Sequence, residues 1–152
     1  MKRMKRMKLM AGIAVALLMG LPTLYGQSNN IVMPVPETTS VNGVVQVTIP
    51  FDFSVSGKTL AAGEYLIAPS GEKGIAFKGV KGNGAAVVLT HPISNSKADG
   101  PKLVFHRYGD KYFLAQAWLR YSDTGCELFA SPDEIQMARA YRQQNVELVA
   151  AK

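Results

Sequence analysis

The stretch Val45-Gln46-Val47-Thr48-Ile49-Pro50-Phe51-Asp52-Phe53-Ser54-Val55 alternates apolar and polar side chains along its whole length. Successive side chains of a strand point to opposite faces of a sheet. Six apolar residues at every second position therefore predict a strand with one buried and one solvated face. Pro50 has no backbone N–H to donate, so we expect the strand to lie at an edge, to bulge or to break there. The stretch favours a β-sheet protein.

Short turns separate further predicted strands along the chain. The segments 60–68, 75–78, 85–91, 102–108 and 111–119 have strand composition, and Pro92 is expected to end the strand over 85–91. Gly109-Asp110 is a two-residue hairpin signal between the last two. Closely spaced strands with little helical pattern favour one all-β domain, either a single antiparallel β-sandwich or a small barrel.

One short C-terminal helix is also expected. Ser131 suits the N-cap, Pro132 suits the first helical position, and Glu134 completes a capping-box pattern with Ser131. A modest apolar stripe follows, made of Ile135, Ala138 and either Tyr141 or Arg142. Asn145 is the predicted stop, and 146–150 is a candidate for a last strand.

The first 26 residues have the pattern of a cleaved secretory signal peptide. Five Lys and Arg residues precede the uncharged stretch Leu9–Leu21, and Pro22 follows it. This stretch is shorter than the about 20 apolar residues of a membrane-spanning helix, so we expect no membrane span after cleavage. Cleavage is expected after Gly26 or Ser28, with a periplasmic or extracellular destination. Residues 27–43 are predicted to be an extended or disordered lead-in, and 44–152 the β-rich domain.

The charge of the chain changes once this signal is set aside. The full sequence has 17 Lys and Arg against 11 Asp and Glu, a net charge of +6. Five of the basic residues and none of the acidic ones lie in residues 1–26, which leaves a net charge of +1. Nucleic-acid binding requires a basic face or stripe. No such cluster remains, so no nucleic-acid partner is expected.

The sequence predicts no catalytic, cofactor or metal site. Gly57-Lys58-Thr59 resembles the end of a phosphate-binding loop, but Asp52 stands where that loop needs a glycine. His91, His106 and Cys126 have no metal-ligand spacing, so only the fold could bring them together. Cys126 is the one cysteine and is expected to be a half-buried small residue. Trp118 is expected to anchor the core, with a hydrogen-bond partner for its indole nitrogen.

The hairpin around Gly109-Asp110 is the best candidate for an interaction patch. Its candidate residues are His106, Arg107, Tyr108 and Tyr112, since Tyr and Arg supply contact area in interfaces. Strand alternation places His106 and Tyr108 on one face and Arg107 on the other. The alternative is that Tyr108 with Lys111, or Arg107 with Tyr112, form cross-strand pairs that stabilise the turn. We favour this alternative.

Two segments carry a resemblance to a group of proteins. Ile49-Pro50-Phe51-Asp52-Phe53-Ser54-Val55-Ser56-Gly57-Lys58-Thr59-Leu60-Ala61-Ala62-Gly63-Glu64-Tyr65 is one of them. Leu103-Val104-Phe105-His106-Arg107-Tyr108-Gly109-Asp110-Lys111-Tyr112-Phe113-Leu114 is the other. Together they resemble small exported proteins of unassigned function that are common in acidobacterial genomes. The resemblance implies export and a β-rich domain, and it implies no chemistry.

The sequence thus favours an exported, non-catalytic domain that binds a protein or an envelope component, with no prediction of its oligomeric state. One alternative is a small-ligand carrier with its ligand in the mouth of a barrel. Another is a hydrolase whose site is assembled from distant residues. A carrier requires an apolar cavity, and a hydrolase requires His91 or His106 to meet a carboxylate, Ser or Cys126.

Overall fold

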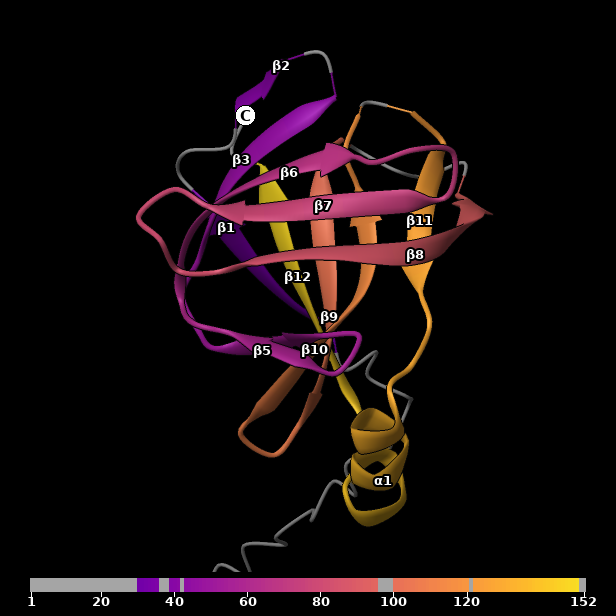
Figure 1. Ribbon diagram of the computed structural model, residues 1–152. Helices are drawn as coiled ribbons and strands as arrows, with labels where there is room; N and C mark the ends of the chain where they lie inside the picture. The colour runs from indigo at the N-terminus through magenta and orange to yellow at the C-terminus, as the bar shows by residue number, and fades with distance from the viewer. Residues whose placement is uncertain (1–29, 36–38, 42, 96–99, 121, 151–152) are drawn as a thin grey trace, which may run out of the picture.

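A computed structural model describes residues 30–35, 39–41, 43–95, 100–120 and 122–150 (Figure 1). The predicted signal peptide and both predicted cleavage sites lie outside these residues. The described part is mostly strand with one short helix, which confirms an all-β fold with a C-terminal helix. The elements are β1 (Asn30–Val35), β2 (Thr39–Val41), β3 (Val44–Ile49), β4 (Phe53–Val55), β5 (Lys58–Leu60), β6 (Gly63–Pro69), β7 (Gly74–Gly79), β8 (Ala85–Ser94), β9 (Lys102–Tyr108), β10 (Lys111–Trp118), β11 (Thr124–Leu128), α1 (Pro132–Ala140) and β12 (Gln144–Ala150).

The strands form one continuous hydrogen-bonded path that curls on itself. Its order is β1-β12-β9-β10-β11-β8-β7-β6-β3-β2, with β4 beside β10 and β5 beside β4. In Figure 1, β6, β7 and β8 run crosswise in front of β12, β9 and β10. The long strand β8 connects the two layers, because residues 85–89 pair with β7 and residues 90–94 pair with β11. Most pairs are antiparallel, as predicted, but β1–β12 and β4–β10 are parallel.

The alternating stretch forms β3 and β4, with the break that Pro50 predicts between them. Its side chains at 45, 47, 49, 53 and 55 are each at most 3% exposed. They pack against the inner faces of both layers, where the largest fully buried side chains include Tyr65, Phe77 and Phe105. Phe53 makes edge-to-face contacts with Tyr65 and Phe105, with centroid distances of 5.4 and 5.6 Å. The alternating side chains therefore form one buried face of β3 and β4, as the sequence predicts.

Three strand predictions were incomplete or wrong. The structure adds β11, which the sequence did not predict. The paired strands β1 and β2 lie inside the expected lead-in 27–43, so the sheet begins before residue 44. The expected strand over 60–68 is divided into β5 and β6, and β5 already starts at Lys58. Pro92 does not end β8. Pairing with β7 stops at Leu89, so β11 is the only described strand that pairs with β8 at Pro92, and a missing N–H on the other side breaks no described ladder.

The helix α1 starts as predicted and ends earlier. Ser131 caps it by accepting a hydrogen bond from the Glu134 backbone N–H at 3.2 Å, and Pro132 is its first residue. It ends at Ala140, while the predicted stop Asn145 already belongs to β12. The predicted apolar stripe faces solvent, because Ile135 and Tyr141 are 45% and 52% exposed whereas Glu134 is buried. Within the described ranges, no helix has the length and apolar character needed to cross a membrane.

Trp118 is buried, as predicted, at 2% exposure. Its ring lies directly against the backbone of Gly125, where a β-carbon would come within 2.5 Å of the indole Cδ2. The predicted partner of its indole Nε1 is not found among the described residues. Gly125 thus fits this position because it has no side chain.

Candidate functional site

The hairpin candidates lie in the register that cross-strand pairing requires. Lys111 is opposite Tyr108, and Tyr112 is opposite Arg107. Tyr108 is only 2% exposed, so it offers no surface to a partner. The guanidinium carbon of Arg107 lies 5.5 Å from the centroid of the Tyr112 ring, and Arg107 Nε donates to the Gly109 carbonyl at 2.8 Å. The cross-strand interpretation of the hairpin is the one that this geometry supports.

The Tyr112 ring also packs against a residue from outside the hairpin. Its ring stacks on Phe51 with a centroid distance of 3.8 Å and an interplanar angle of 12°. Phe51 in turn contacts Phe105 edge to face at 5.1 Å. The segment between β3 and β4 therefore covers the inner side of the hairpin. These aromatic side chains pack within the molecule.

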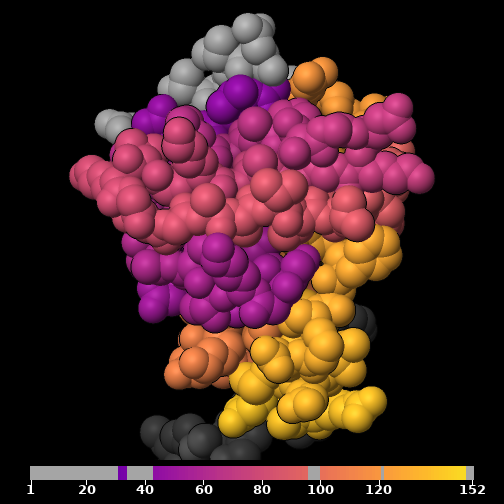
Figure 2. Space-filling model, in the orientation of Figure 1, coloured from indigo at the N-terminus to yellow at the C-terminus, as the bar shows by residue number. Residues whose placement is uncertain are grey.

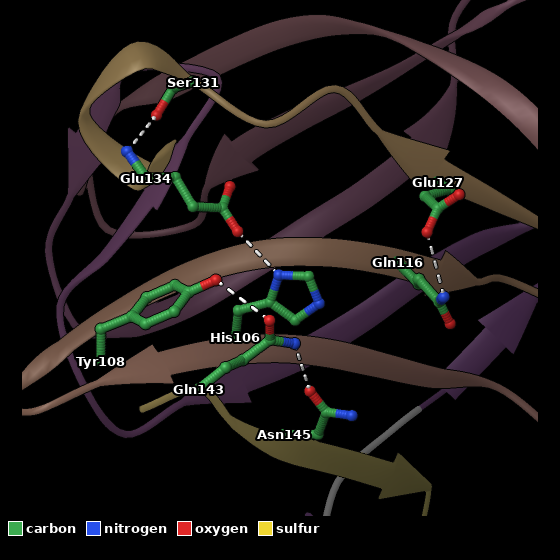
Figure 3. Close-up of polar contacts among 8 residues, drawn as sticks. All are labelled: His106, Tyr108, Gln116, Glu127, Ser131, Glu134, Gln143 and Asn145. Atoms are coloured by element: carbon green, nitrogen blue, oxygen red, sulfur yellow. Dashed lines mark hydrogen bonds and ion pairs between the residues drawn. The ribbon is translucent and has the colours of Figure 1, made fainter. Parts of the chain in front are cut away.

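On the other face of β9, His106 connects the sheet to the helix (Figure 3). Its Nδ1 lies 2.7 Å from Glu134 Oε1, and the Glu134 side chain is 8% exposed. The capping-box pattern predicts that this carboxylate turns back to the Ser131 N–H. The structure instead directs it to His106, while Ser131 still caps the helix. Because a buried carboxylate requires a polar partner, His106 is best explained as a structural residue.

Tyr108 extends the same polar cluster toward β12. Its hydroxyl donates to Gln143 Oε1 at 3.2 Å, and Gln143 Nε2 donates to Asn145 Oδ1 at 3.0 Å (Figure 3). Burial raises the pKa of the Tyr108 hydroxyl above its ordinary value of 10.0, and the nearby Glu134 charge raises it further. The neutral phenol is the form that this environment stabilises. The contacts of the cluster join β9, β12 and α1, which is the arrangement of a structural network.

The second histidine also meets a carboxylate. His91 on β8 and Glu127 on β11 are directly opposite in the sheet, and His91 Nε2 lies 2.7 Å from Glu127 Oε2. Gln116 Nε2 donates to the other carboxylate oxygen at 3.4 Å. His91 Nδ1 is buried and has no hydrogen-bond partner among the described residues. The His91 ring also contacts Phe129, with centroids 5.2 Å apart.

The most exposed apolar side chains lie beside this pair. We define the β8 surface as Val87, Leu89 and Phe129, which are 70%, 70% and 61% exposed. Val87 and Leu89 point to the outer face of β8, while Val88 between them is 7% exposed and belongs to the core. β7 and β8 form a band across the front of the molecule in Figure 2. The sequence prediction did not include this surface, although the uninterrupted apolar run Val87-Val88-Leu89 indicates a strand that is apolar on both faces.

A hollow of about 310 Å³ adjoins the β8 surface. Its lining residues are Lys73, Leu89, Thr90, His91, Pro92 and Phe129. By contrast, the space where β3 faces β9, β10 and β12 is about 10 Å³, and Val45, Val47, Leu103 and Leu148 are among its walls. That volume holds at most about one water molecule. The larger of these two openings is therefore the one on the outer face of β8.

Cys126 lies next to Glu127 on β11 and packs against the core from a partly buried position. Adjacent residues of a strand face opposite sides of the sheet, so the thiol points away from the His91–Glu127 pair.

In the part of the chain that the structure describes, no group of three or more His, Cys, Asp or Glu side chains is placed to hold a metal ion.

Comparisons with known proteins found no matching family model, no similar curated protein and no similar solved structure.

Proposed function

We propose that this chain is an exported, non-catalytic protein-interaction domain that acts through the β8 surface. One observation carries the proposal: Val87 and Leu89 are neighbours on one outer sheet face and are both 70% exposed. Phe129 and the adjoining hollow extend the apolar area at one end. Contiguous exposed apolar patches of this kind mark interaction sites, whereas single exposed apolar residues are common and carry no such meaning. The β8 surface replaces the hairpin as the proposed interaction patch.

Photocrosslinking in cells that express the full chain tests the proposal. Benzoylphenylalanine replaces Val87 or Leu89, and after irradiation we expect a covalent protein adduct at both positions. The matched control is Val80, which is 45% exposed in the turn between β7 and β8. Adducts that form equally at all three positions, or at none of them, would contradict the proposal.

Export rests on the N-terminal sequence pattern and on the resemblance to small exported acidobacterial proteins. Expression of the full chain in a bacterial host, followed by fractionation and N-terminal sequencing, tests it. We expect the periplasmic or extracellular product to begin at Gln27 or Asn29. A product that keeps Met1 and stays in the cytoplasm would contradict export.

For the architecture we propose a small, partly open barrel in preference to a sandwich. The two ends of the strand path are β1 and β2, and three residues of chain separate them. The distance from Val35 to Thr39 is therefore at most about 14 Å. This short connection brings the ends of the path near one another, as barrel closure requires. The opening of about 10 Å³ beside Val45, Val47 and Leu103 is too small to hold an internal ligand.

A hydrolase is the second candidate, favoured by the His91–Glu127 pair beside the hollow. In a nucleophilic site, a carboxylate orients an imidazole, and the imidazole activates a Ser, Thr or Cys side chain. Among the described contacts of His91 there is no hydrogen bond to a Ser, Thr or Cys side chain. Hydrolysis of p-nitrophenyl acetate by the purified protein, abolished in His91→Ala, would favour the hydrolase. Equal rates in the two proteins would exclude this site.

A further inference from the structure

We propose that Asn83 is a self-modification site, at which the side-chain amide reacts with the backbone nitrogen of Gly84 and is converted to aspartate and isoaspartate. The site lies in the turn between β7 and β8 and is independent of the β8 surface. Asn83 is partly buried there, and Gly84 is exposed. Water is the only co-reactant that the conversion needs, so the groups of the turn itself must supply the chemistry.

The reaction passes through a succinimide ring. Gly84 N loses its proton and attacks Asn83 Cγ, so that an N–Cγ bond forms. The Cγ–Nδ2 bond breaks, and Nδ2 leaves as ammonia together with the proton that the backbone nitrogen released. Water then opens the ring. Its attack at Cγ yields aspartate, whereas its attack at the main-chain carbonyl carbon of residue 83 yields isoaspartate.

Both reacting groups are available in the folded protein. Among the described residues, neither the Gly84 N–H nor the Asn83 side-chain amide has a hydrogen-bond partner. Gly84 has no side chain to hinder the attack, and its φ of 108° is a conformation that favours glycine. The Gly84 carbonyl accepts a hydrogen bond from the Gly79 N–H at 2.8 Å. This bond closes the turn and leaves the Gly84 nitrogen free to react.

The Tyr65 hydroxyl lies where the first step creates charge. It donates to the Asn83 carbonyl oxygen at 3.1 Å and shares its proton with the Ala61 carbonyl at 2.5 Å. When Gly84 N loses its proton, negative charge spreads onto the Asn83 carbonyl oxygen, because both atoms belong to one conjugated peptide group. A donor directed at that oxygen stabilises the anion, as the donors of an oxyanion hole do. The structure thus promotes the step that starts the reaction.

The protonation state of Tyr65 suits this role. Burial raises the pKa of the Tyr65 hydroxyl above its ordinary value of 10.0, and the Asp52 charge raises it further. The hydroxyl therefore keeps its proton, and remains a donor, at neutral and mildly alkaline pH, where the backbone nitrogen loses its own proton more readily.

The modification is expected to loosen the turn. The Asn83 side chain lies so close to Gly63 that no β-carbon would fit at position 63. Aspartate places a carboxylate at this contact. Isoaspartate also adds one methylene group to the main chain, which should open the hydrogen bond between Gly79 and Gly84. The modified protein should therefore be less stable than the unmodified one.

Peptide mapping of the purified full chain after incubation at mildly alkaline pH tests the inference. Mass spectrometry with electron-transfer fragmentation distinguishes aspartate from isoaspartate. We expect both products at position 83, formed in the folded chain at least as fast as in guanidinium chloride, where the contact with Tyr65 is lost. Asn145 is the control within the same digest. Its Oδ1 accepts a hydrogen bond from Gln143 and the branched Val146 follows it, so it should stay unmodified in the folded chain.

An Asn83 that stays intact in the folded chain, or that reacts more slowly there than in the unfolded chain, would overturn the inference.

Tyr65→Phe tests the assigned donor. The variant should form both products about tenfold more slowly, a smaller loss than that of a full oxyanion-hole donor because the hydroxyl also serves Ala61. Tyr108→Phe removes another buried hydroxyl and should leave the rate unchanged. Circular dichroism verifies that both variants are folded. Equal rates in Tyr65→Phe and the unmodified chain would show that the hydroxyl has no part in the reaction.

Asn83→Gln tests the effect on the fold, because its longer side chain disfavours the five-membered ring. We expect the urea midpoint of the unmodified chain to fall during the incubation and that of Asn83→Gln to stay constant. A parallel fall in both proteins would contradict the loosening of the turn.

Discussion

Gly125 lies so close to Trp118 that a β-carbon at position 125 would come within 2.5 Å of the indole ring. The backbone of β11 thus closes over the only tryptophan of the chain, which is 2% exposed. The relationship explains why a glycine stands inside a strand, where its flexibility would otherwise be unfavourable.

Gly125→Ala is expected to lower the free energy of unfolding by about 1–3 kcal/mol, because the added methyl group overpacks a buried site. Urea denaturation monitored by tryptophan fluorescence measures the change. In a Trp118→Leu background, followed by circular dichroism, the same substitution should cost less, since the smaller side chain leaves room for the methyl group. Equal costs in the two backgrounds would show that the contact is not the cause.

Glu134→Ala is expected to destabilise the protein by about 1–3 kcal/mol, because His106 loses the partner that lies 2.7 Å away. Asp133→Ala is the matched control. It also removes an acidic residue from the first turn of α1, but its side chain is exposed. The control should cost about 0.3–1 kcal/mol, the usual contribution of a helix-terminal charge. Similar losses in the two variants would argue against the His106–Glu134 contact as a tie between α1 and β9.

The stability of the protein should fall at alkaline pH. Burial raises the pKa values of the Tyr65 and Tyr108 hydroxyls above 10.0, so above that pH the unfolded chain releases protons that the folded chain retains. The free energy of unfolding is therefore independent of these groups below about pH 10 and decreases as the pH rises further.

Tyr108→Phe tests this linkage. The variant should lose stability at neutral pH through its missing hydrogen bond to Gln143, yet decline less steeply above about pH 10. Urea midpoints measured from about pH 7 to 11 give both quantities. Tyr141→Phe is the control, because Tyr141 is 52% exposed, and its profile should follow that of the unmodified protein. A Tyr108→Phe slope as steep as that of the unmodified protein would contradict the assignment.

The stack of Phe51 on Tyr112 should be measurable as a pairwise coupling. In a double-mutant cycle of Phe51→Leu and Tyr112→Leu, we expect a coupling free energy of about 0.5–1.5 kcal/mol, the range for aromatic pairs. Leu keeps most of the buried apolar area, so the cycle isolates the ring contact. The exposed Phe129 supplies the comparison: Phe129→Leu combined with Tyr112→Leu should be additive.

The sequence predicts local elements well where one physical requirement acts alone. The Gly109-Asp110 hairpin has the predicted register, and Ser131 caps the helix at the predicted position. The prediction fails where a residue or strand that is distant in the sequence changes what the local segment needs. Pro92 stays within β8 because no described strand pairs with one side of β8 there. The helix α1 turns its apolar stripe to solvent because the Glu134 carboxylate is directed to His106.

The alternation of Val45 to Val55 by itself determined a sheet with one buried face, because a strand places every second side chain on the same side. It could not determine which strands meet across the core, since that depends on pairings between residues far apart in the chain. Only the tertiary structure brought His91 to Glu127 and left Val87, Leu89 and Phe129 exposed together. The local sequence specifies which side chains of a strand share a face, whereas the fold specifies which residues pack against that face.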